Sequence, residues 1–223
     1  MKKISFLFAL LLLLSSTYIS AQAASGASKA DETPELTVIS SYTTTFNPDS
    51  VNRSINIALS ADAINGTVVK PGEEFSFNET VGQRTADRGY KSATIISGGR
   101  FVNGIGGGIC QVSGTLFNAA VLAGMEITER RNHGLKVSYL PGGRDATVSW
   151  GEIDLKFKNT SDAEMTILIS IEDGVLEVKF ATNGLYTPPT VEAIVTGKSL
   201  WRFEMTTYVN GEQYQTFTSA YSG

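Results

Sequence analysis

The chain contains a single cysteine, Cys110, and a single histidine, His133. A cysteine thiolate is a strong nucleophile, and an imidazole is the usual base and proton carrier beside it. The two residues can therefore support acyl transfer, in which the thiolate attacks a carbonyl carbon and forms a thioester while the imidazole moves the proton.

The residues around Cys110 favour this chemistry. Six glycines fall within residues 98–108, just before it, and three of them, Gly106, Gly107 and Gly108, stand together. Apolar residues then recur at spacings of three and four, which predicts an amphipathic helix over 110–123 that ends at Gly124. Free N–H groups and the helix dipole at the start of such a helix stabilise a thiolate. The N–H groups of Gly107 and Gly108 could also stabilise an oxyanion.

Two points near the cysteine stay open from the residues alone. Gln111 either provides a further side-chain donor or lies on the helix surface. A lone cysteine is a small buried apolar residue, one half of an intermolecular bridge, or a nucleophile. A strand predicted near Lys136 could return His133 to the start of the helix, so the geometry allows the pairing.

The N-terminal segment predicts export. Lys2-Lys3 precede an apolar run over 4–14, and Ala21-Gln22-Ala23 forms a small-x-small cleavage signal, so residues 1–23 are interpreted as a signal peptide. The apolar run is shorter than the roughly 20 residues that span a bilayer. We therefore expect a secreted or cell-surface protein, with residues 24–35 as a flexible lead-in.

The remaining pattern predicts an α+β fold with an antiparallel-rich sheet, in one domain over 36–223 whose residues 191–223 are a candidate C-terminal strand appendage. A helix is expected over 51–63, with Ser50 as its N-cap. The glycine-rich residues 98–108 are interpreted as one loop. Strands are expected over 36–45, 136–140, 146–150, 153–157, 165–171 and 175–180, and on both sides of Asn210-Gly211.

Composition excludes several classes of protein. The formal charge of −4 and the sequence pI near 5.1 provide no basic surface for phosphates, so we expect no nucleic-acid partner. A structural zinc site takes about four Cys or His ligands, and one cysteine cannot form an intramolecular disulfide. We therefore expect neither a metal nor another cofactor, and the oligomeric state is left open.

Residues 71–159 resemble the VanW family, found in Gram-positive cell-surface proteins and in some glycopeptide-resistance clusters. The segments that carry the resemblance are PGEEFSFNETVGQRTADRGY at 71–90, GGGICQVSGTLFNAAVLAGMEITER at 106–130, HGLKVSYLPGGRDATVSW at 133–150 and DLKFKN at 154–159. Some VanW domains look like L,D-transpeptidases with an essential cysteine. The resemblance implies that Cys110 attacks a tetrapeptide stem of peptidoglycan, expels the terminal D-Ala, and passes the acyl group to a second stem as a 3-3 crosslink.

This implied substrate assigns further residues. Arg84 and Arg131 are candidates to bind the terminal carboxylate of the stem. Asp145 is the expected acceptor for the second nitrogen of His133, with Asp154 or a backbone carbonyl as competitors. Three other functions stay open: a cysteine carboxypeptidase or endopeptidase, a non-enzymatic cell-wall-binding module linked to glycopeptide resistance, and a redox sensor.

Overall fold

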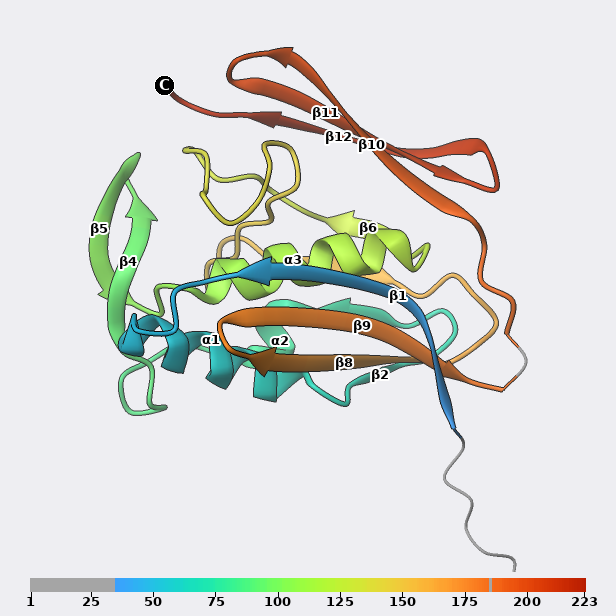
Figure 1. Cartoon of the computed structure of the whole chain (residues 1–223), viewed down its shortest axis with the longest axis horizontal. Helices are drawn as coiled ribbons and strands as arrows, with labels where there is room; N and C mark the ends of the chain where they lie inside the picture. The colour runs from blue at the N-terminus through green and yellow to red at the C-terminus, as the bar shows by residue number, and fades with distance from the viewer. Residues whose placement is uncertain (1–34, 185) are drawn as a thin grey trace, which may run out of the picture. The chain divides into compact units, whose positions relative to one another are not determined.

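The computed structural model describes residues 35–184 and 186–223. Within these ranges the chain combines antiparallel sheets with a few helices, which confirms the predicted mixed class (Figure 1). The predicted signal peptide over 1–23 and nearly all of the lead-in over 24–35 lie outside the described residues.

The largest sheet has four strands in the order β1-β9-β8-β2. They are β1 (Leu36–Thr45), β9 (Val175–Asn183), β8 (Met165–Glu172) and β2 (Val68–Val69). The β8–β9 hairpin turns at Asp173-Gly174, where both residues have a positive φ, as the predicted turn requires. Ile167, Val178 and Phe180 of this sheet are fully buried.

Two helices contact this sheet, α1 (Val51–Ile64) and α3 (Ile109–Leu122). Helix α1 ends one residue beyond the predicted range of 51–63. Ser50 is its N-cap residue, as predicted, although its side chain makes no capping hydrogen bond. Instead, the Ser50 carbonyl accepts hydrogen bonds from the backbone N–H and the side chain of Ser54.

A second sheet has the order β3-β7-β6, with strands β3 (Glu74–Ser76), β7 (Lys156–Lys158) and β6 (Glu126–Glu129). The short helix α2 (Phe77–Val81) follows β3, and the Ser76 side chain caps it. Phe75 and Phe157 stack at 4.7 Å between ring centroids, and the Phe157 ring meets Phe180 of the first sheet edge-on at 5.6 Å. These aromatic contacts join the two sheets.

The prediction of one glycine loop over 98–108 is wrong. Residues 92–105 form a hairpin of β4 (Ser92–Ser97) and β5 (Arg100–Ile105) that turns at Gly98-Gly99. Gly104 lies inside β5 and interrupts the residue pattern that would have indicated a strand. Only residues 106–108 form the loop that leads into α3.

The expected strands over 136–140 and 146–150 are also wrong, and the expected strand over 153–157 is reduced to β7. Apart from an isolated bridge between Ser149 and Ile153, residues 133–155 are irregular. Their carbonyl groups bind side chains of α3 instead of a neighbouring strand: Ser113 donates to Ala146 and Asn118 donates to Arg144. This segment therefore lies along α3.

The C-terminal residues form a third sheet of β10 (Val191–Ser199), β11 (Arg202–Val209) and β12 (Glu212–Ala220). The two strands predicted on either side of Asn210-Gly211 are present, and β10 adds a third that was not predicted. The Gln215 side chain binds both backbone groups of Ile127 in β6. The C-terminal sheet is thus hydrogen-bonded to the rest of the described chain.

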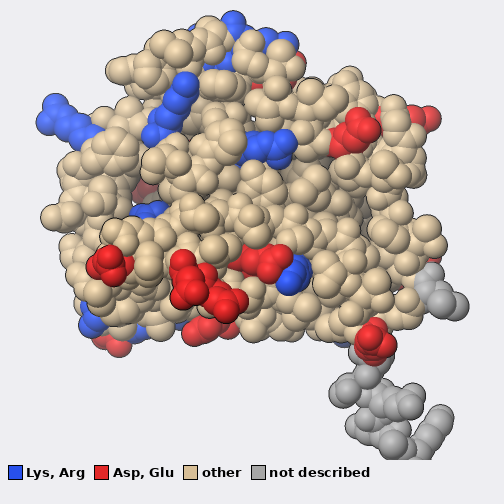
Figure 2. Space-filling model, in the orientation of Figure 1, with Lys and Arg blue, Asp and Glu red and all other residues tan. Residues whose placement is uncertain are grey.

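Charged side chains are dispersed on the face shown in Figure 2, where several acidic groups lie together in the lower part of the view. Within residues 35–184 and 186–223, no helix has both the length and the apolar character needed to cross a bilayer.

Candidate functional site

Cys110 is the second residue of α3, directly after the glycine loop. Gly108 is the N-cap residue with φ 114°, a conformation that disfavours other residues. A Cβ atom on Gly107 would lie 2.5 Å from the Thr94 carbonyl oxygen, so the loop passes too close to β4 for a side chain. Glycine is therefore required for the backbone itself at these positions.

The loop leaves backbone donors available near the sulfur. The N–H groups of Ile109 and Gln111 donate back to Gly106 and Gly108. The N–H groups of Gly107, Gly108 and Cys110 have no acceptor among the residues that the structure describes. Cys110 is a half-buried residue, and its thiol donates to the Val148 carbonyl oxygen at 3.6 Å.

His133 and Asp145 form a buried pair beside Cys110. The His133 Nδ1 atom lies 2.7 Å from Asp145 Oδ2, and the His133 backbone N–H donates to the same oxygen at 2.7 Å. Asp154, the competing carboxylate, instead accepts hydrogen bonds from Ser76, Asn78 and Leu155. The structure therefore brings Asp145, and not Asp154, to the imidazole.

The charges and hydrogen bonds around Cys110 and His133 favour a thiolate and an imidazolium. Burial by itself would raise the pKa of Cys110, but the hydrogen bond and charge of His133, together with the charge of Arg84, lower it overall. Burial would lower the pKa of His133, but its hydrogen bonds to Asp145 and Cys110 raise it to about 9. Each group thus stabilises the charged form of the other.

Cys110 and His133 line a cleft of about 1080 Å³. One wall is the β4–β5 hairpin, which Figure 1 shows beside the start of α3, and another is the irregular segment that includes Tyr139 and Trp150. Phe101 and Trp150 are large exposed side chains in these walls. The cleft is large enough to admit a peptide to the Cys110 sulfur.

Two arginines also line the cleft, on either side of the glycine loop. The aliphatic part of Arg84 lies beside Gly106, and that of Arg53 lies beside Gly108. Arg84 donates to the Asn78 side chain and the Gly82 carbonyl. Arg53 donates to Gln111 at 2.8 Å and lies over the Tyr139 ring. Neither guanidinium forms an ion pair with a carboxylate of the described residues.

Gln111 lines the cleft but supports other residues there, and Arg131 does not line it. The Gln111 side chain is buried and donates to the Thr44 hydroxyl and the Thr45 carbonyl, so its donors are already used and it is not helix surface. Its carbonyl oxygen holds Arg53, which makes it a support for that arginine. The Arg131 side chain is exposed and does not line the cleft.

Two residues at this site were not predicted from the sequence. Arg53 lies on the first helix, far from the cysteine in sequence, and no local motif marks it. Tyr221 follows the last strand, and its hydroxyl group reaches the Asp145 carboxylate. Only the packing of distant elements brings either of them here.

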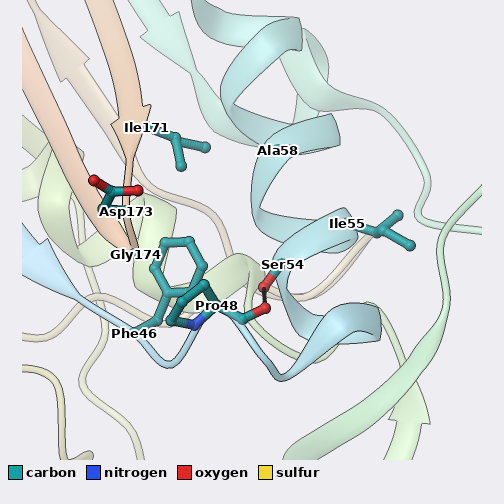
Figure 3. Close-up of a pocket in the computed structure, with 8 residues that line it drawn as sticks. All are labelled: Phe46, Pro48, Ser54, Ile55, Ala58, Ile171, Asp173 and Gly174. Carbon is teal, nitrogen blue, oxygen red and sulfur yellow. Dashed lines mark hydrogen bonds between the residues drawn. The ribbon is translucent and has the colours of Figure 1, made fainter.

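A smaller recess of about 410 Å³ shares Phe46 with the cleft (Figure 3). Its walls are mainly apolar, and the Ser54 hydroxyl at its edge is hydrogen-bonded to the Pro48 carbonyl. Neither Cys110 nor His133 lines this recess, whereas both line the larger cleft.

Comparison with known proteins shows which family the chain belongs to. The family model described as VanW like protein matches residues 52–181. The chain belongs to the VanW-like family. The VanW-like region contains Cys110, His133, Asp145 and both arginines, whereas Tyr221 lies beyond it.

Two curated relatives carry the same region. The uncharacterized protein YoaR of Bacillus subtilis is 57% identical over 118 residues, which are 53% of this chain and 39% of YoaR. The vancomycin B-type resistance protein VanW of Enterococcus faecalis is 35% identical over 127 residues, 55% of this chain and 46% of that protein. The matched region thus spans less than half of either relative. No solved structure matches the chain.

Proposed function

We propose that this VanW-like chain is an exported cysteine acyltransferase, an L,D-transpeptidase that joins peptidoglycan stem peptides by 3-3 crosslinks. The observation that carries the proposal is the Cys110–His133–Asp145 network, of which Cys110 and His133 line an open cleft and Asp145 is buried behind them. The order nucleophile, imidazole and buried carboxylate is the arrangement that activates cysteine for acyl transfer.

The first half of the reaction acylates the enzyme. The Cys110 thiolate attacks the carbonyl carbon of the third residue of a tetrapeptide stem, and the N–H groups of Gly108 and Cys110, which have no acceptor among the described residues, would stabilise the oxyanion. When the tetrahedral intermediate collapses, the bond to the terminal D-Ala breaks. The imidazolium of His133 donates its proton to the departing amine, and the acyl group stays on sulfur as a thioester.

The second half transfers the acyl group. The side-chain amine of a second stem attacks the thioester carbonyl, neutral His133 removes the proton from this amine, and Cys110 leaves as a thiolate. A new amide bond links the third residues of the two stems. The thiolate and imidazolium are restored, so no external cofactor or energy source is consumed.

The two arginines support an anionic substrate. Arg53 and Arg84 are partly buried in the cleft without an acidic partner among the described residues, and burial lowers the pKa of each. A bound carboxylate would offset the free-energy cost of burying these two positive charges, because it would form charge-assisted hydrogen bonds with them. The free carboxylate of a stem peptide provides this group. A relative named for resistance to vancomycin, a cell-wall antibiotic, supports a substrate of the same kind.

Hydrolysis is the second candidate. Cys110 is a half-buried residue that lines the open cleft, so water can also reach a thioester formed there. Attack by water in place of an amine would make the protein a carboxypeptidase that uses the same residues.

Incubation of the purified protein with a disaccharide tetrapeptide, followed by mass spectrometry, separates these functions. Transpeptidation predicts loss of D-Ala with formation of a crosslinked dimer. Loss of D-Ala without a dimer would assign hydrolysis, whereas an unchanged substrate would contradict both enzymatic functions and favour the wall-binding alternative. Cys110→Ala is expected to abolish either reaction while its thermal unfolding stays close to that of the unsubstituted protein, and Asp162→Asn, a change at an exposed residue outside the cleft, should leave both reactions intact.

A further inference from the structure

The end of the last strand is hydrogen-bonded to the loop that carries the histidine. The Asn132 side chain donates to the Ala220 carbonyl at 2.8 Å, and the Ser222 N–H donates to the Gly134 carbonyl at 2.7 Å. The neighbours of His133 on both sides are thereby bound to the neighbours of Tyr221 on both sides. This pairing fixes where the Tyr221 side chain enters the site.

The Tyr221 hydroxyl has a defined direction. It accepts a hydrogen bond from the Gly143 N–H at 2.7 Å and donates to Asp145 Oδ1 at 2.5 Å. The ring is buried and meets the Phe203 ring edge-on, with 5.9 Å between centroids. Burial and the adjacent carboxylate raise the pKa of Tyr221 to about 12, so the hydroxyl keeps its proton at physiological pH.

The two oxygens of Asp145 have separate roles. Oδ2 accepts both hydrogen bonds from His133, while Oδ1 accepts from Tyr221 at 2.5 Å and from Arg130 at 3.5 Å. Tyr221 is therefore the close donor on Oδ1. Without it, the carboxylate would be held firmly on one side only and could rotate away from the imidazole.

We propose that Tyr221 is a positioning residue, which holds the Asp145 carboxylate against His133 and thereby makes the C-terminal strand part of the active site. This residue lies beyond the matched region 52–181, so the VanW-like region alone does not contain the complete network. The effect of Tyr221 on turnover rests on the proposed function, whereas its effect on the protonation of His133 and Cys110 does not depend on that function.

The chain offers direct probes of this proposal, because its single histidine and single cysteine produce unambiguous signals. In Tyr221→Phe, we expect the pH midpoint of Cys110 alkylation by iodoacetamide to rise by about one unit, which is a tenfold lower thiolate fraction below the midpoint. The NMR titration midpoint of His133 is expected to fall by a similar amount. Unchanged midpoints, or shifts in the opposite directions, would overturn the proposal.

Tyr214→Phe is the matched control, since Tyr214 is an exposed tyrosine of β12, the strand that Tyr221 follows. It loses the same hydroxyl and should leave both midpoints unchanged; an equal shift would overturn the specific role of Tyr221. In combination with Asp145→Asn, Tyr221→Phe should add no further shift, because it acts through that carboxylate. Independent, additive shifts would also contradict the proposal.

Turnover provides the second readout. With tetrapeptide as substrate, Tyr221→Phe should lower kcat about tenfold and leave KM unchanged. If the unsubstituted protein has no activity, the proposed function fails while the two titrations still decide the role of Tyr221. Should Tyr221→Phe fail to fold, NMR of the unsubstituted protein decides it: a hydroxyl proton protected from solvent exchange is expected, and rapid exchange would overturn the proposal.

Discussion

His133 Nδ1 lies 2.7 Å from Asp145 Oδ2, and neither residue belongs to a helix or a strand. Both sit in irregular chain that is bound to the side of α3, the helix that carries Cys110. The buried carboxylate raises the pKa of the imidazole, and the charged imidazole lowers that of the thiol. The positions of three side chains thus depend on one helix and the segment packed against it.

Replacing the carboxylate should weaken the imidazolium. Asp145→Asn is expected to move the pKa of His133 from about 9 toward its ordinary value of 6.5 and to reduce kcat by about 100-fold, because an amide carries no negative charge. NMR titration of the single histidine measures the first effect. Asp162→Asn removes an exposed carboxylate and should change neither value; an unshifted His133 in Asp145→Asn would contradict the network.

The reactivity of the thiol should depend on the histidine. Alkylation of Cys110 should reach half its maximal rate below pH 9.0, the ordinary value for the thiol, because His133 and Arg84 stabilise the thiolate. In His133→Ala, burial dominates and the midpoint should rise. Mass spectrometry of the alkylated protein provides the rates, and identical midpoints in the two proteins would exclude a thiolate–imidazolium pair.

The pH dependence of turnover should be bell-shaped. Activity should rise as Cys110 ionises and should fall near pH 9, where His133 loses the proton that the departing amine requires. The measurement is kcat/KM for the tetrapeptide between pH 5 and pH 10, as approximate limits chosen to bracket both groups. A profile that keeps rising above pH 9 would show that His133 is not the general acid.

Each arginine should recognise a carboxylate. Arg53→Gln and Arg84→Gln are each expected to raise KM for the tetrapeptide about tenfold or more, since a hydrogen bond to a charged group contributes about 1.5–3 kcal/mol. A tetrapeptide whose carboxylates are amidated should bind the variants and the unsubstituted protein equally. Arg131→Gln, an exposed arginine outside the cleft, is the control, and equal effects of all three changes would contradict a carboxylate site.

The glycine loop should tolerate no side chain at its centre. In Gly107→Ala the new Cβ would lie 2.5 Å from the Thr94 carbonyl oxygen, so the loop must move and the oxyanion donors with it. We expect a loss of about 1–3 kcal/mol in the free energy of unfolding, with a larger loss of activity. Gly134→Ala meets nothing within 4 Å and should have little effect. Thermal unfolding and turnover of the two variants provide the comparison.

Local patterns account for the parts of the fold that were predicted. The apolar spacing of α1 and α3 and the turn at Asp173-Gly174 depend on neighbouring residues, so these elements could be read from the sequence. The strands expected over 136–140 and 146–150 failed because their residues favour extended chain locally, while the available hydrogen-bond partners are side chains of α3. Propensity describes what a segment can form and does not specify its partner.

One cysteine and one histidine left a single candidate nucleophile and a single candidate base in the sequence, and the glycines before Cys110 indicated the start of a helix. The packing of the whole chain determined which other residues surround these two. It selected Asp145 over Asp154, placed Arg53 in the cleft in place of Arg131, and brought Tyr221 from the end of the chain to the carboxylate. The physical reason is that a buried charge takes its partners from whichever elements pack around it, and that packing is a property of the whole fold.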